Sequence, residues 1–103
     1  MTTLTVLFEQ FLKEKRYLKN VTPKTLDWYT SAWGAFTKSV TVSEPGHLTR
    51  GKLSEFVVAS RERGLSPVTV NTWSKAVNAF LAWLQVEGHL AEKLALAPLR
   101  RTS

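Results

Sequence analysis

The stretch LSPVTVNTWSKAVNAF, residues 65–80, decides how this chain folds, because its skeleton occurs twice. The first copy, VTPKTLDWYTSAWGAF, residues 21–36, lies 44 positions earlier (65 − 21). In each copy a Ser or Thr precedes Pro, a Thr follows two residues after the Pro, and Phe closes the segment. A hydroxyl at the N-cap accepts hydrogen bonds from backbone N–H groups, and Pro at the first helical position lacks an N–H that would have no partner. Both copies therefore predict the start of an α-helix.

The spacing of apolar residues extends these two helices and predicts two more. We expect helices over about 4–17, from Pro23 to near Lys38, from Thr49 to Gly64, and over about 67–87. The residues expected to face inward, in chain order, are Leu4, Leu7, Phe8, Phe11 and Leu12, then Leu26, Tyr29, Trp33 and Phe36, then Leu53, Phe56, Val57 and Val58, and finally Val70, Trp73, Val77, Phe80, Leu81 and Leu84.

The predicted fold class is all-α, a bundle of four main helices arranged as two pairs. Residues 39–47 are expected to form a loop, because Pro45-Gly46 ends the alternation of valines too early for a strand. After Gly88, the segment HLAEKLALAPLRRTS leaves room for a short fifth helix before Pro98.

The composition favours a polyanionic partner. The chain has 14 Lys and Arg against 8 Asp and Glu, which gives a net charge of +6 and a pI near 10. Basic residues that meet phosphates release condensed counterions, although the same charge also keeps a small protein soluble. Each half of the chain carries seven basic and four acidic residues, so no tail holds the excess. A binding surface must therefore be assembled by the fold.

Several classes of protein are disfavoured by the sequence. The absence of cysteine excludes a disulfide framework and a Cys-based zinc site. No apolar run approaches the roughly 20 residues of a membrane-spanning helix. The N-terminus lacks the basic start and cleavage site of a signal peptide. We expect a soluble, intracellular domain with no membrane partner.

The chain offers little for catalysis. Its two histidines, His47 and His89, have no acidic pair at metal-ligand spacing, and its glycines form no phosphate-binding loop. The string HLTR, His47 to Arg50, forms a His-x-x-Arg box, which we interpret as an exposed loop histidine, a Thr49 N-cap and a first helical turn. We expect no metal site, no catalytic residue, no cofactor and no small-molecule substrate.

A polar side of the last long helix is the best candidate for a binding surface. It carries Thr69, Asn71, Thr72, Lys75 and Asn78. Asn can pair bidentately with adenine in the major groove, while Lys and Thr reach phosphates or guanine. The alternative is an ordinary solvated helix face, but such faces usually carry Lys and Glu, and residues 66–84 contain no acid.

The earlier copy of the skeleton carries Lys24, Thr25, Asp27, Trp28 and Ser31 at the matching positions. Lys24, Thr25 and Ser31 are candidate DNA contacts. Asp27 stands where Asn71 stands in the later copy, and its carboxylate would repel phosphate unless it is paired. We interpret Trp28 as a core residue.

The order and spacing of these features resemble the N-terminal core-binding domain of tyrosine recombinases, the phage-integrase and Xer-like family. The resemblance covers roughly residues 4–90, and it depends on the order of its landmarks because each is weak by itself. The landmarks are Thr22, Thr25, Tyr29, Leu48, Thr49, Leu53, Phe56, Ser66, Thr69, Phe80, Trp83, Leu84 and Gly88.

The resemblance implies a SAM-like bundle that clamps one face of double-stranded DNA, with its second and fourth helices against the major groove and phosphates. A separate catalytic domain with a tyrosine nucleophile would close on the other face. This chain is then expected to be a non-catalytic fragment, with residues 1–90 as the DNA-binding domain and residues 91–103 as the start of a linker. In that linker Arg100 and Arg101 would touch the DNA backbone. Other recombinase protomers on DNA are further expected partners, in the nucleoid-associated cytoplasm of a bacterial, phage or mobile-element system.

Two features differ from the family pattern. Asn78 stands near a position where many members carry Arg, and Gly88 is followed by HLAEKLALAP in place of Asn-Pro. The His47–Arg50 box lies in the wrong domain for the family's catalytic box, and no tyrosine follows it. The alternative function is a helical protein–protein interaction module, because SAM-like bundles also serve in assembly.

Overall fold

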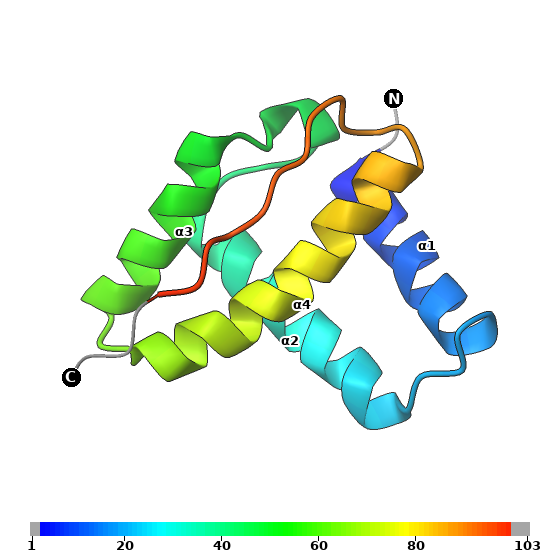
Figure 1. Cartoon of the computed structure of the whole chain (residues 1–103), viewed down its shortest axis with the longest axis horizontal. Coiled ribbons are helices and arrows are strands. Elements are labelled where there is room, and N and C mark those ends of the chain that lie inside the picture. The colour runs from blue at the N-terminus through cyan, green and yellow to red at the C-terminus, as the bar shows by residue number, and fades with distance from the viewer. Residues whose placement is uncertain (1–2, 100–103) are drawn as a thin grey trace.

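The chain folds into a bundle of four α-helices, as the sequence predicted (Figure 1). The structure is a computed structural model that describes residues 3–99. Its elements are α1 (Leu4–Tyr17), α2 (Pro23–Ser39), the 3₁₀ turn η1 (Pro45–His47), α3 (Arg50–Glu62) and α4 (Pro67–Val86), with no strand among the described residues. The predicted helix ends agree with these bounds to within one or two residues.

The two copies of the skeleton begin their helices with the same hydrogen bonds. The Thr22 hydroxyl accepts from the Thr25 N–H at 3.3 Å, and the Ser66 hydroxyl accepts from the Thr69 N–H at 3.2 Å. In each copy the cap hydroxyl also pairs with the hydroxyl of that second residue, at 3.1 and 3.2 Å. Pro23 and Pro67 occupy the first helical position. The predicted caps are confirmed, and each satisfies one of the orphan N–H groups at a helix start.

An aromatic cluster joins the helices at the crossing of α2 and α4, the most extensively packed pair of helices. The ring of Phe80 on α4 lies 4.8 Å from Trp33 of α2 and 5.1 Å from Phe8 of α1, edge-on to both. Phe36 of α2 continues the cluster to Phe56 of α3 at 5.2 Å. All five side chains are buried, so burial of a large apolar area coincides with favourable ring geometry.

Most of the predicted inward-facing residues are buried, but Val58 is 55% exposed. Leu53, Phe56 and Ser60 form the inward side of α3, and Val58 projects away from that side because it lies two residues past Phe56. Leu12, Leu26, Val57 and Trp73 are half-buried. Trp28 is also half-buried and packs against the core, in agreement with its interpretation.

The described residues after Gly88 form no fifth helix, although the sequence leaves room for one. Residues 93–99 have no helical structure and run back along α4 as an extended segment, between α3 and α4 (Figure 1). The backbone groups of Leu96 and Leu99 bond to side chains of α4 in place of the partners that a helix would supply within the segment. Leu96 is buried in the same core as the helices. The packed part of the described chain therefore extends past residue 90 to include Leu96.

The cap geometry generates a prediction about stability. Replacing Ser66→Ala removes the hydroxyl that satisfies the Thr69 N–H, and we expect the free energy of unfolding to fall by about 1 kcal/mol. Urea unfolding followed by circular dichroism measures this change. Ser54→Ala is the matched control, because Ser54 is exposed and makes no hydrogen bond with the described residues. Equal stability of the two variants would contradict the role of the cap.

Candidate nucleic-acid interface

The starts of α4 and α2 lie at the two ends of the lower side of the molecule in Figure 1, at the lower left and the lower right. Each start follows a turn that is preceded by the basic end of the previous helix. α1 ends with Lys15 and Arg16 in its last turn, and α3 ends with Arg61. Cations at a helix C-terminus are favourable to the helix dipole, whereas a helix N-terminus attracts anions. The fold therefore places basic side chains beside two helix starts on one edge.

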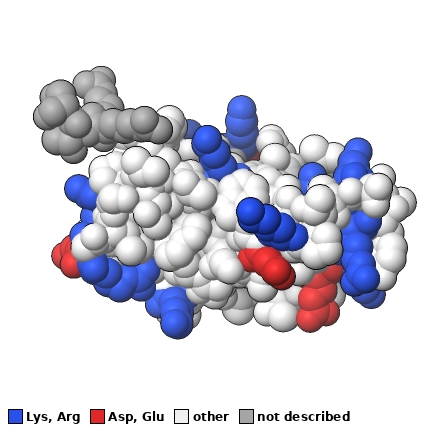
Figure 2. Space-filling model, turned by 90° about the horizontal axis from the view of Figure 1, so that it is seen from below, with Lys and Arg blue, Asp and Glu red and all other residues white. Residues whose placement is uncertain are grey.

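We define two corners on this edge by their basic residues. The first corner contains Arg16, Lys19 and Lys24, and the second contains Arg61 and Arg63. All five residues are exposed. Figure 2 views the molecule from below and shows Lys and Arg side chains spread over this face, with separate acidic side chains among them.

The charges of the two corners are not neutralised by ion pairs among the described residues. Among residues 3–99, the oppositely charged side chains within 4.0 Å of each other are Lys52 with Glu55 and His47 with Glu44. Both pairs lie outside the corners. Arg61 donates to the backbone carbonyl of Leu65 at 2.9 Å, which fixes the turn before α4 without cancelling its charge. Exposed carboxylates nevertheless lie beside these cations, because Glu62 stands between Arg61 and Arg63 in sequence and Asp27 lines a pocket together with Arg16.

Each helix start leaves little backbone for an anion to contact. Pro occupies the first position, and the third N–H is taken by the cap hydroxyl. The N–H groups of Lys24 and Val68, at the second position, have no hydrogen-bond partner among the described residues. An anion at either start would therefore meet one backbone donor and the nearby basic side chains.

Four of the predicted site residues are exposed, and three of these have side chains without a partner in the described part of the chain. Lys24, Ser31 and Lys75 are exposed, and their side chains make no hydrogen bond or ion pair with residues 3–99. Lys24 lies at the start of α2, whereas Ser31 and Lys75 lie farther along their helices. These residues can contact a partner without rearrangement.

The predicted threonines serve the helices themselves. The hydroxyls of Thr25 and Thr69 pair with the cap residues, and the Thr72 hydroxyl donates to the Val68 carbonyl at 2.9 Å. Thr25 and Thr69 are half-buried, and Thr72 is exposed. These hydroxyls could contact DNA only in the orientations that their hydrogen bonds within the helices allow.

The structure divides the polar side of α4 that the sequence predicted as one open face. Asn71 and Asn78 are half-buried and each makes two hydrogen bonds to the C-terminal segment, at 2.7 to 3.0 Å. Lys75 lies between them in sequence but is exposed. With the segment in place, neither asparagine is open to a base edge. Arg100 and Arg101 lie outside the described residues.

Four residues of the corners were not predicted from sequence, namely Arg16, Lys19, Arg61 and Arg63. A signal for two of them was present, because Lys19 and Arg63 also stand 44 positions apart (63 − 19), three residues before the cap in each copy. Beside the first corner, the Arg16 guanidinium stacks over the ring of Tyr17, with 5.1 Å to its centroid, and Tyr17 is 69% exposed. An exposed aromatic ring with a cation is suited to contact a sugar or a base.

The His-x-x-Arg box serves the local backbone, as interpreted from sequence. The Nδ1 atom of His47 accepts from the N–H groups of Ser43 and Glu44 at 3.1 and 3.3 Å. Thr49 caps α3 by accepting from the Lys52 N–H at 3.2 Å. Within residues 3–99, no three His, Asp or Glu side chains come together as metal ligands, and no helix has the length and apolar character to cross a membrane.

No protein-family model, curated protein or solved structure matches this chain.

The two asparagines generate a prediction about hydrogen exchange. The N–H groups of Leu96 and Leu99 donate to Asn78 and Asn71 at 2.7 Å. The N–H groups of Ala95 and Ala97 have no such partner among the described residues. We expect the two leucine amides to exchange at least about tenfold more slowly than the two alanine amides. Native-state exchange followed by NMR measures the rates, and equal rates along the segment would contradict this placement.

Proposed function

We propose that this chain is a DNA-binding clamp domain of the tyrosine-recombinase type, non-catalytic by itself. It would contact the phosphates of double-stranded DNA, and the edge of the major groove, through the starts of α2 and α4. The observation that carries the proposal is the repeated unit of basic turn, hydroxyl cap, Pro and helix, whose two copies lie on one edge.

Charge supports this proposal. Lys19 and Arg63 occupy equivalent positions before the two helix starts, and none of the corner cations is neutralised by an ion pair within residues 3–99. Two similar corners suit a partner such as double-stranded DNA, whose backbone repeats the same phosphate group at regular intervals. Phosphate contacts of this kind set the position of a protein on the duplex and give a steep dependence on salt.

Few of the polar side chains on α4 are open to contact bases. Lys75 and Thr72 are exposed on α4, but Asn71 and Asn78 hold the C-terminal segment. Binding through the corners would therefore be mainly electrostatic, and any use of the asparagines on DNA would require the segment to leave α4.

The alternative function is a protein–protein interaction module, and one observation favours it. Val86 at the end of α4 is 81% exposed and Leu18 after α1 is 74% exposed. Exposed apolar side chains can mark an interaction surface, although scattered ones are common in soluble proteins. These residues are not gathered at one place in the fold, so we favour DNA binding.

Reversing the charge at the equivalent positions tests the proposal. The double variant Lys19→Glu/Arg63→Glu removes one cation from each corner. Each phosphate contact contributes about 0.9 to the slope of log affinity against log salt, so the slope should become shallower by about two. Fluorescence anisotropy with a duplex of about 25 base pairs, between about 50 and 200 mM salt, measures the slope.

The control variant is Lys13→Glu/Lys38→Glu, which changes the net charge equally but alters exposed lysines outside the corners. Its slope should stay near that of the unchanged chain. If the control loses as much affinity as the corner variant, binding follows net charge and the corners are not the interface. If the unchanged chain fails to bind DNA even at low salt, the interaction module becomes the better proposal.

A further inference from the structure

The C-terminal segment, residues 94–99, is held on α4 by two asparagine side chains. The Asn78 amide donates to the Leu96 carbonyl at 3.0 Å and accepts from the Leu96 N–H at 2.7 Å. The Asn71 amide makes the same pair of bonds with Leu99, at 2.9 and 2.7 Å. Each asparagine thus satisfies both the donor and the acceptor of one backbone residue. This recognition reads the backbone of the segment and not its side chains.

The spacing of the asparagines matches the spacing of the residues that they hold. Seven residues of an α-helix advance about 10.5 Å, which separates Asn71 from Asn78 along α4. Three residues of an extended chain span about 9 to 10 Å, which separates Leu96 from Leu99.

The three-residue interval also selects a kind of extended chain. Residues three apart lie on the same side of a polyproline II helix, whereas in a flat strand they lie on opposite sides. Pro98 lies between Leu96 and Leu99, the two residues that the asparagines hold, and it restricts Ala97 to extended conformations. A polyproline II helix has no internal hydrogen bonds, so its backbone is available to external amides. The site on α4 therefore suits an extended, proline-containing peptide.

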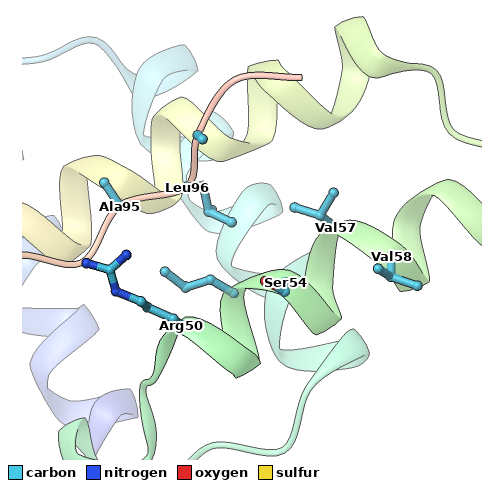
Figure 3. A pocket seen from close by; sticks show the side chains of 8 residues that line it. Arg50, Ser54, Val57, Val58, Ala95 and Leu96 are labelled. Carbon is cyan, nitrogen blue, oxygen red and sulfur yellow. The ribbon is translucent and has the colours of Figure 1, made fainter. Parts of the chain in front are cut away.

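Side-chain contacts of the segment are few. Leu96 is 5% exposed and points toward α3 and the core (Figure 3), and Leu94 and Leu99 are half-buried. Ala95, Ala97 and Pro98 are exposed. No backbone–backbone hydrogen bond joins residues 90–99 to the rest of the described chain.

The segment fits α4 closely but leaves space on the side of α3. A pocket of about 430 Å³ separates it from α3 (Figure 3). The residues that line this pocket are Arg50, Leu53, Ser54, Val57, Val58, Ala95, Leu96 and Ala97. The segment is therefore hydrogen-bonded along α4 and is bordered by a pocket on the side of α3, next to the buried Leu96.

The internal repeat provides a comparison for the two asparagines. The positions in α2 that correspond to Asn71 and Asn78 are Asp27 and Gly34 (71 − 44 and 78 − 44). A carboxylate cannot donate to a backbone carbonyl, and glycine has no side chain. The copies share the residues that start and pack the helices but differ at both of these positions. The asparagine pair thus occurs in the later copy and not in the earlier one.

We propose that the groove between α3 and α4 is a binding site for an extended, proline-containing apolar peptide, with residues 94–99 of this chain as its built-in ligand. The segment leaves and re-enters the groove while the four helices stay folded. Four hydrogen bonds and the burial of Leu96 stabilise the bound segment, and the entropy lost when six residues become ordered opposes them. The proposal does not depend on DNA binding.

The test uses the full chain with residues 94–99 replaced by alternating Gly and Ser, and the synthetic peptide KLALAPL, residues 93–99. Circular dichroism first establishes whether this variant keeps its helices. The peptide should then bind saturably and shift the side-chain amide NMR signals of Asn71 and Asn78. The unchanged chain should bind the peptide at least tenfold more weakly, because its own segment occupies the groove.

Two controls test the roles of the asparagine pair and of Leu96. Adding Asn71→Ala and Asn78→Ala to the Gly-Ser chain should weaken binding of the peptide at least tenfold, and a peptide with Leu96→Asp should bind as weakly. Loss of helix in the Gly-Ser chain would overturn the proposal, because the segment would then be an integral part of the fold. A folded Gly-Ser chain that does not bind the peptide, or binds it equally without the asparagines, would also overturn it.

Discussion

The crossing of α2 and α4 is the contact on which the rest of the structure depends. Phe80 and Trp33 meet there edge-on at 4.8 Å, and Phe8 and Phe36 extend the cluster to α1 and α3. Close-packed rings tolerate little change of angle between the helices. The crossing therefore fixes the direction of both helices, and with it the position of their starts and of the groove beside α4.

Two surfaces of different chemistry follow from that crossing. The helix starts come to one edge with basic turns beside them, where an anion meets charge and one free N–H per helix. The groove between α3 and α4 offers neutral amides and an apolar pocket, which suit a peptide backbone. α4 belongs to both surfaces, through its start and through the asparagines farther along. A partner can therefore bind at one of these surfaces while the other surface stays unoccupied.

The fold could be predicted from sequence where its causes are local. Ser66, Pro67 and the stripe from Val70 to Leu84 determine a helix through neighbours within a few residues, and the structure agrees with these predictions. The roles of Asn71 and Asn78 could not be predicted, because their partners lie 28 and 18 residues away in a segment without periodicity. The sequence pattern around an asparagine on a helix is the same whether its side chain binds DNA, water or a segment of backbone. Four of the five corner residues were not predicted, because they lie at helix ends and in the turns that follow and form no stripe along one helix.

The most direct test of the account is an NMR titration of the full chain with a duplex of about 25 base pairs at low salt, following the backbone amides of Lys24 and Val68. Each is the open N–H at one helix start. If both starts engage one duplex, the two signals should shift together with a single affinity, while the amide of the exposed Ser54 on α3 stays unchanged. A shift at only one start, or at neither, would contradict the claim that the fold brings two equivalent starts to one DNA-binding edge.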